Sequence, residues 1–313
     1  MSLAAILNPV LLLITIAVAG FIISKRISVT NEVKQFVTFI VINLALPGVV
    51  IQSIFSLQLD TQIWRYLSIV FIAGFSLNLI GLAIGYGLTR AFRYPPFVSR
   101  QAAVLSGLGN TGFIGIPFLA LMLGAEAGAF ASIYDAATMS LTFTVGIMLL
   151  QSGKFQKNQL KALLNAPFLT LLVSISMVYL NLTPVNFVMD LSEIFAGLSA
   201  PLAMIYIGLL LGSWKKESLL EVKEHYSRFL IIVISTKVIL LPMLAFAVVP
   251  LFDLPLTIKQ VIIIQAGMPS LLLGLVLIER YKGNVQVAIT VILATSVLYL
   301  CLVPIFTYLS SLL

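Results

Sequence analysis

The chain has 313 residues, of which 60% are apolar and only 9% are charged, and its formal net charge at pH 7 is +7. Soluble globular domains carry about 25% charged residues, so this composition excludes a water-soluble enzyme or binding domain of useful size. The long apolar stretches do not alternate with polar residues, which favours membrane-spanning helices over a β-barrel.

Ten membrane-spanning helices are predicted, because ten apolar stretches of about 20 residues each suit the roughly 30 Å hydrocarbon core of a bilayer. The fold class is therefore an all-α membrane protein. In chain order, the predicted spans are residues 4–24, 33–55, 64–89, 100–123, 128–150, 163–181, 186–212, 227–250, 258–279 and 284–311.

The first span contains Ala17-Val18-Ala19, which has the small-residue pattern of a signal-peptidase site. No Lys or Arg precedes the apolar run, however, so the basic segment that begins a signal peptide is missing. We expect residues 4–24 to be retained as a helix rather than removed.

Span four has a glycine-rich, polar middle that ends in Pro117. Proline removes a backbone donor and clashes with the preceding turn, and glycine lets the chain leave helical geometry. We therefore predict a break near the middle of the bilayer. The alternative is that the glycines only allow close helix packing. The segment reads Ser106-Gly107-Leu108-Gly109-Asn110-Thr111-Gly112-Phe113-Ile114-Gly115-Ile116-Pro117.

A matching break is predicted in span nine, where Pro269 follows Pro117 by 152 residues. Each half-helix after a break presents an N-terminus with about half a positive charge, so two such ends that meet could hold a carboxylate without an arginine. Polar side chains beside the breaks could add hydrogen bonds. The candidate substrate-binding residues are Asn43, Asn110, Thr111, Gly112, Pro117, Gln265, Met268, Pro269 and Ser270.

Two ionisable residues, Asp135 in span five and Lys237 in span eight, lie within predicted spans and are candidates for coupling. A charge at the centre of a membrane helix costs roughly 2.5–3.5 kcal/mol, so each should face the protein interior. Asp135 fits a proton or cation site, or else a structural hydrogen-bonded carboxylate. For Lys237 we favour a side chain that reaches the cytoplasmic surface.

The basic residues predict the orientation, because cytoplasmic loops are enriched in Lys and Arg. Fifteen of the 18 lie in or beside the odd-numbered loops. Those loops should therefore be cytoplasmic and both termini outside, in the cell membrane. The same distribution assigns the positive charge to topology and lipid headgroups, so we expect no nucleic-acid partner.

The two halves of the chain resemble each other weakly. Pro47 in span two is followed 154 residues later by Pro201 in span seven, and Asn8-Pro9 in span one resembles Asn165-Ala166-Pro167 in span six. Five spans per half would place the second unit in the opposite orientation, a recurrent plan in transporters. The predicted units are residues 1–151 and 162–313, joined by a short cytoplasmic connector at 152–161.

The segment from Asn110 to Pro117 resembles the Asn-x-x-x-x-Gly-Ile-Pro motif of the auxin efflux carrier family, which includes plant PIN-FORMED carriers and bacterial malate and malonate permeases. The segments from Asn43 to Pro47 and from Ala266 to Ser270 resemble its second and ninth helices. The chain lacks the long loop between helices five and six of many plant carriers, and so looks more like the short microbial type.

The resemblance implies ten helices, with the fourth and ninth crossing at their prolines and with site residues at Asn110, Pro117 and Pro269. It also implies a dimeric scaffold of helices one, two, six and seven, against which a transport domain moves like an elevator. The predicted function is a secondary transporter of small organic anions such as auxin-like acids or dicarboxylates. The alternative is a sodium-coupled symporter of the bile acid type.

An enzyme is not expected. Asp135 is the only aspartate well inside a span, so the paired carboxylates of an aspartyl protease are missing. With Cys301 and His225 each alone of its kind, neither a metal site nor a bound cofactor is predicted, apart from a coupling proton or sodium ion. A receptor is also disfavoured, because no signalling domain is attached.

Overall fold

The computed structural model describes residues 3–57, 61–151, 160–161, 164–212 and 216–313, and all its regular elements in these ranges are helices. Six helical segments are long and apolar enough to cross a membrane, and each ends within three residues of a predicted span. The all-α membrane prediction is thus confirmed for the described residues. The six are Glu32–Phe55, Gln62–Ala91, Ala125–Leu150, Asn186–Gly212, Glu224–Leu251 and Val285–Ser310.

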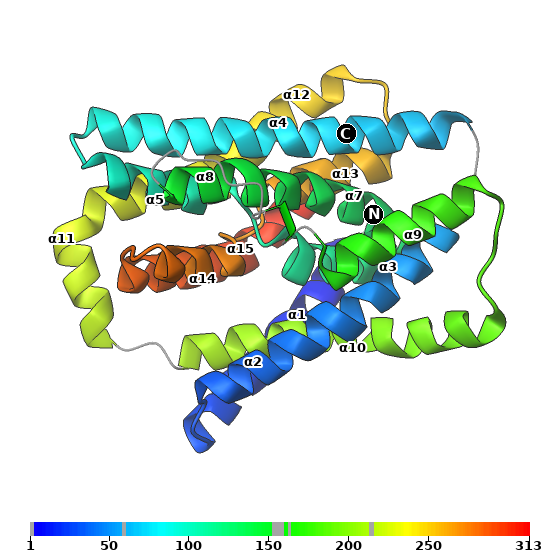
Figure 1. Ribbon diagram of the computed structural model, residues 1–313, viewed down its shortest axis with the longest axis horizontal. Coiled ribbons are helices and arrows are strands. Elements are labelled where there is room, and N and C mark those ends of the chain that lie inside the picture. Colours follow the sequence, from blue (N-terminus) through cyan, green and yellow to red (C-terminus); the bar gives the residue numbers. More distant parts are fainter. Residues whose placement is uncertain (1–2, 58–60, 152–159, 162–163, 213–215) are drawn as a thin grey trace.

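The remaining predicted spans have different forms. Span one is a single helix, and span six is a short one of 14 residues. Spans four and nine are each interrupted (Figure 1). The connector predicted at 152–161 lies outside the described residues except for its last two positions.

In chain order, the first predicted half contains α1 (Leu3–Arg26), α2 (Asn31–Ile40), η1 (Val41–Ala45), α3 (Leu46–Phe55), α4 (Thr61–Ala91), α5 (Pro96–Gly107), η2 (Thr111–Gly115), α6 (Ile116–Leu123), α7 (Ala125–Leu141), η3 (Thr142–Gly146) and α8 (Ile147–Leu150). The second contains α9 (Ala166–Tyr179), α10 (Asn186–Gly212), α11 (Lys216–Ser235), η5 (Thr236–Leu240), α12 (Leu241–Val248), η6 (Val249–Leu251), α13 (Leu256–Ala266), α14 (Leu272–Arg280) and α15 (Val285–Ser310).

Short π-helical turns precede three of the prolines in these helices. η1, η2 and η5 lie immediately before Pro47, Pro117 and Pro242, each of which is near the start of the next α-helix. Proline cannot donate to the helical ladder and clashes with the carbonyl one turn back. A wider π-turn relieves both problems, so the helix continues through the proline.

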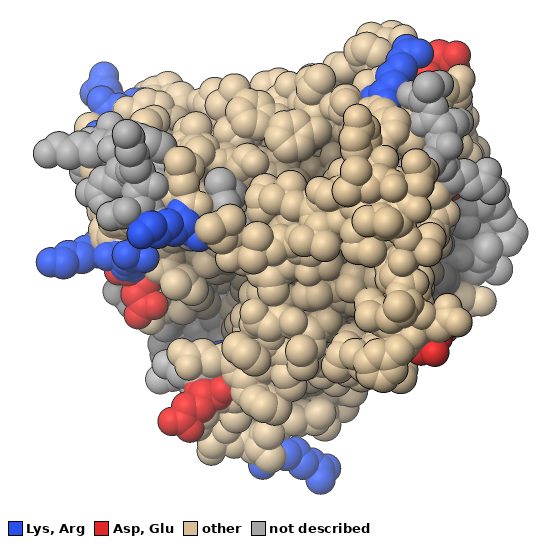
Figure 2. Space-filling view, turned by 45° about the vertical axis from the view of Figure 1, so that its right-hand side comes forward, with Lys and Arg blue, Asp and Glu red and all other residues tan. Residues whose placement is uncertain are grey.

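The connections lie at two opposite ends of the molecule. In Figure 1 the turns between α4 and α5 and between α14 and α15 are at the left end, whereas those between α3 and α4 and between α9 and α10 are at the right end. Figure 2 shows charged residues toward the edges of one face and a broad uncharged area between them. This distribution fits a protein whose middle faces lipid.

Glycines bring the backbones of α1, α3 and α10 into direct contact. A Cβ atom on Gly20 of α1 would lie 2.9 Å from the Cα of Ile205 in α10, and one on Gly208 of α10 would meet the backbone of α1. On the other side of α10, a Cβ on Gly48 of α3 would lie 2.9 Å from the backbone nitrogen of Ala196. Small residues permit this close approach, which is typical of helix pairs in membranes.

A second close pair is formed by α4 and α5. A Cβ atom on Gly81 would lie 2.8 Å from the Cα of Gly107, and one on Gly107 would lie 2.5 Å from the backbone nitrogen of Leu82. The last turn of α5 is therefore held directly against α4.

Candidate functional site

Two non-helical stretches pass each other inside the protein: residues 108–110 between α5 and η2, and residues 267–271 between α13 and α14. We call this pair the crossover. Every residue in both stretches is buried. Interrupted helices are tolerated at membrane depth only where protein surrounds the freed backbone or a cavity adjoins it.

The freed backbone groups of the crossover bind each other. The amide of Asn110 donates to the carbonyl of Pro269 at 2.7 Å, and the amide of Leu271 donates to the carbonyl of Leu108 at 3.0 Å. The two stretches thus form a minimal antiparallel bridge. Each supplies hydrogen-bond partners that the other lost when its helix ended.

Pro117 does not lie at the interruption, and the expected crossing at both prolines is wrong on this point. The helix has resumed at Thr111, and Pro117 lies within the following segment, Thr111–Leu123. The physical reason is the π-turn of η2, in which the carbonyl of Asn110 accepts from the amides of both Ile114 and Gly115. Pro269, by contrast, lies in the crossover itself.

Ser270 ties the crossover to two other helices. Its hydroxyl donates to the carbonyl of Leu105 at 2.7 Å, and its amide donates to the hydroxyl oxygen of Thr295 on α15 at 3.1 Å. Thr295 was absent from the predicted residues. A threonine in an apolar helix usually bonds its own backbone, so no sequence signal indicates this role.

Three glycines, spaced three residues apart from Gly109 to Gly115, make room for buried polar side chains from three other helices. A Cβ atom on any of them would come within 3.0 Å of the side chain that it faces. Their φ angles are not positive, so their role is space rather than an unusual backbone conformation. The pairs are Gly109 with Lys237, Gly112 with Asp135, and Gly115 with Gln265.

Asp135 reaches the crossover from α7. The hydroxyl of Thr111 donates to its carboxylate at 2.6 Å, and the other carboxylate oxygen lies beside Gly112. Thr111 and Gly112 begin the second half-helix of span four. Asp135 therefore lies at a helix N-terminus, where a negative charge is favoured.

Lys237 is buried, with 1% of its surface exposed, and its ammonium donates to the carbonyl of Ala266 at 3.2 Å. The expectation that it extends to the cytoplasmic surface is wrong. The carbonyl it binds is at the C-terminus of α13, where a positive charge is favoured. Gly109 offers space for the end of the side chain, which explains why the lysine turns inward.

Gln265 and Asn110 bring polar atoms to the crossover that are only partly satisfied. The Gln265 amide nitrogen donates to the carbonyls of Thr111 and Ala131, at 3.3 Å in each case. Its side-chain oxygen and the amide nitrogen of Asn110 are both buried, and neither has a hydrogen-bond partner among the described residues. Unpaired buried groups of this kind are unusual and are candidates for ligand contact.

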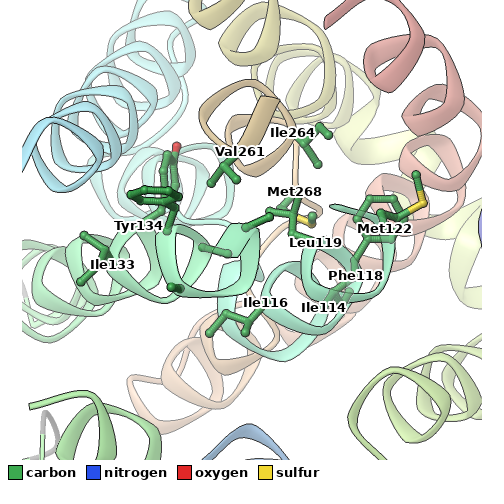
Figure 3. Packing of buried hydrophobic residues seen from close by; sticks show 14 of the residues in the cluster. Ile114, Ile116, Phe118, Leu119, Met122, Ile133, Tyr134, Val261, Ile264 and Met268 are labelled. Atoms are coloured by element: carbon green, nitrogen blue, oxygen red, sulfur yellow. The ribbon is translucent and has the colours of Figure 1, made fainter. Parts of the chain in front are cut away.

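Two other predicted residues have different surroundings. Asn43 is exposed, and its side chain donates to the carbonyl of Phe39 in the preceding turn at 3.0 Å, so it is not part of the crossover. Met268 is fully buried among the apolar side chains where α6, α7 and α13 converge (Figure 3). Its side chain fills the core.

A small cavity is lined by Asp135, the partner of Thr111, together with Ser132. Another part of its wall is formed by Pro167 and Phe168, from the first turn of α9. This wall was not predicted as part of the site. The remaining lining residues are Val50, Ile116, Ala136, Met139 and Leu171.

The comparisons with known proteins agree with a transport role. The sequence model of the family described as "Membrane transport protein" matches residues 5–162 and 156–307, almost the whole chain. A relative from Methanocaldococcus jannaschii, described as an uncharacterized transporter, is 26% identical over 308 residues, covering 93% of this chain and 94% of the relative. The chain therefore belongs to this family of membrane transporters, the auxin efflux carrier family that its motifs resemble.

Proposed function

We propose that this chain is a secondary transporter of small organic anions, such as dicarboxylates or auxin-like acids. The observation that carries the proposal is the crossover, where two interrupted helices meet, and where the ionisable Asp135 binds Thr111 directly after the interruption and lines a small cavity. Carriers commonly bind substrates at such breaks, because half-helix ends supply backbone partners without mobile charged side chains.

The polar atoms of the site suit a carboxylate substrate. The amide nitrogen of Asn110 is a buried donor that has no partner in the described part of the chain, and leaving such a group unpaired costs about 1–3 kcal/mol. A substrate oxygen that accepted from it would remove this cost. We assign Asn110 to substrate binding, with Thr111 and Gln265 beside it.

The architecture that we propose has ten spans in two inverted repeats. The recurrence of helix ends supports it, because α5 ends at Gly107 and α13 ends at Ala266, 159 residues later. Likewise, Ala125–Leu150 is followed by Val285–Ser310, 160 residues later. This register aligns the two interruptions with each other and does not align Pro117 with Pro269.

The proposed transport cycle is an elevator-like movement of the crossover helices against a scaffold of α1, α2–α3, α9 and α10. The close contacts of α1, α3 and α10 support a rigid scaffold. We propose that this scaffold also forms a homodimer. Light scattering in detergent would then give twice the chain mass of 34.0 kDa for the protein component, and the mass of one chain would contradict the dimer.

The transport proposal is tested with purified protein in liposomes, by exchange of labelled malate, malonate and indole-3-acetic acid. Asn110→Ala removes the unpaired donor, and Pro269→Leu restores an amide where α13 and α14 are separated. We expect each to lower the flux at least about tenfold. Ser296→Ala is the matched control, because the Ser296 hydroxyl bonds only its own helix among the described residues.

Unchanged flux in both site variants would remove the proposed site, and no flux of any of the three acids in the wild-type protein would contradict the substrate class. Replacing sodium with choline in the same assay separates this carrier from the alternative, a sodium-coupled symporter of the bile acid type.

A further inference from the structure

Lys237 is a charged side chain at the crossover that the proposed binding of an organic anion leaves without a role. It lies in the π-turn η5, is 1% exposed, and donates to the carbonyl of Ala266. A buried charge is costly unless it is paired, so a lysine at this position needs a compensating negative group. The hydrogen bond that the structure gives it leads to a backbone carbonyl and not to a carboxylate.

The compensating group is the C-terminus of α13. Ala266 is the last residue of an 11-residue helix, and its carbonyl is among those left without a partner within the helix. Aligned peptide dipoles place about half a negative charge at this end. The α13 terminus therefore attracts a cation at the crossover.

The opposite stretch of the crossover is shaped to admit the ammonium. A Cβ atom on Gly109 would lie 2.9 Å from the Lys237 nitrogen, so any other residue at this position would crowd it. The lysine nitrogen thus lies between the carbonyl end of α13 and the backbone of Gly109. Both interrupted helices take part in this arrangement.

Carbonyl oxygens at the C-terminal ends of broken helices are also the groups that bind Na⁺ in coupled carriers. An inorganic cation at the α13 terminus would have to displace the ammonium or share its site against like-charge repulsion. We propose that the Lys237 ammonium is a tethered cation that occupies the place of a co-transported alkali ion, so that transport requires neither Na⁺ nor K⁺. This rests on the proposed function as a carrier.

The first test needs no substrate. The thermal midpoint of detergent-solubilised protein is measured in NaCl, KCl and choline chloride at equal ionic strength, for wild type, Lys237→Ala, Lys237→Arg and the control Lys259→Ala. We expect wild type, Lys237→Arg and the control to be indifferent to the cation. Lys237→Ala should have a lower midpoint in choline that rises and saturates with Na⁺ or K⁺, because a vacated site binds the ion by mass action.

The second test is flux of labelled malate in liposomes under the same three salts. Wild-type flux should not change when choline replaces sodium and potassium. Flux through Lys237→Ala should fall about tenfold in choline and recover in part with an alkali cation. Lys237→Gln, which keeps the donor and loses the charge, stands in for Lys237→Ala if that variant does not fold.

Three results would overturn the inference: wild-type flux or stability that depends on Na⁺ or K⁺, neutral variants that transport like wild type in choline, or neutral variants whose midpoint has no cation response. Failure of the carrier proposal would give a different result in these two tests. If wild type transports none of the probe acids, the thermal measurement still decides whether Lys237 takes the place of an ion.

Discussion

At the scale of single residues, three of the glycines in span four matter because they have no side chain. Gly109, Gly112 and Gly115 each face a polar side chain from another helix, and each would crowd it with a single methyl group. Gly112 and Gly115 lie three residues apart and so are neighbours on the surface of the resumed helix, whereas Gly109 lies in the crossover just before it. A glycine motif that is typical of a helix break thus also provides space for buried polar side chains.

Gly112→Ala tests this role. The added methyl group would come within 2.8 Å of an Asp135 carboxylate oxygen, and overpacking of this kind costs about 1–3 kcal/mol. We expect a lower thermal midpoint and reduced flux. Gly87→Ala is the matched control, because nothing lies within 4 Å of its added methyl group. Equal midpoints for the two variants would contradict the assigned role.

Asp135→Asn tests proton coupling. Asp135 is the ionisable residue of its cavity, whose other described lining residues are apolar or Ser132. If its carboxylate exchanges a proton during transport, the amide variant should show a flattened dependence of flux on pH. Glu126→Gln, at an exposed position on the same helix, should keep the wild-type profile. An Asp135→Asn profile that matches wild type would end the coupling role.

At the scale of elements, the crossover depends on hydrogen bonds from helices that are not themselves interrupted. The bond between the Ser270 amide and the Thr295 hydroxyl links the crossover to α15. It gives an acceptor to the Ser270 amide, which makes no hydrogen bond within a helix. A buried donor that is left without an acceptor destabilises the folded protein.

Thr295→Val removes this acceptor and keeps the shape of the side chain. We expect a loss of about 1–3 kcal/mol in stability, because the Ser270 amide would be left without a partner. Thr307→Val on the same helix should cost less, since the Thr307 hydroxyl donates only to the carbonyl of Val303 among the described residues. The measurement is the thermal midpoint of both variants, and an equal loss would argue against a special role for Thr295.

The sequence predicted the positions of helices well and their interruptions less well. The ends of six predicted spans agree with the structure within three residues. A helix that crosses a bilayer needs a minimum apolar length, and this length is visible in the sequence. The break in span four was assigned to Pro117 because proline is the visible helix breaker. The π-turn that accommodates Pro117 has no comparable signature, and the break at 108–110 depends on contacts with span nine.

The candidate site was predictable only in part, for a related reason. Asn110, Thr111, Gln265, Pro269 and Ser270 could be found because polar residues and proline are conspicuous in apolar helices. The direction of a long side chain is not conspicuous, since a lysine within a span can turn either toward the surface or inward. Lys237 turned inward because Gly109, on another span, left room.

At the scale of the whole molecule, the arrangement of charged loops gives a testable orientation. The connections before α5 and after α14 share one end of the molecule (Figure 1). They contain Arg93 and Lys282, and Arg90 and Arg280 lie in the last turns of the helices before them. Because basic loops stay in the cytoplasm, we expect that end to face inward.

Cysteine labelling in intact cells checks this orientation. In a Cys301→Ser background, which removes the exposed native thiol, Glu126→Cys and Asp253→Cys should react with a membrane-impermeant maleimide. Arg280→Cys should react only after the membrane is opened. Labelling of Arg280→Cys in intact cells, with the other two protected, would reverse the assigned topology.

The close packing of α1 against α10 has a mechanical consequence. Sliding between helices requires a layer of side chains that can exchange rotamers, and at Gly20 and Gly208 the two main chains touch with no such layer between them. We therefore expect α1 and α10 to move together as one rigid unit. Any displacement of the crossover across the bilayer has to take place at other helix interfaces, where side chains separate the main chains.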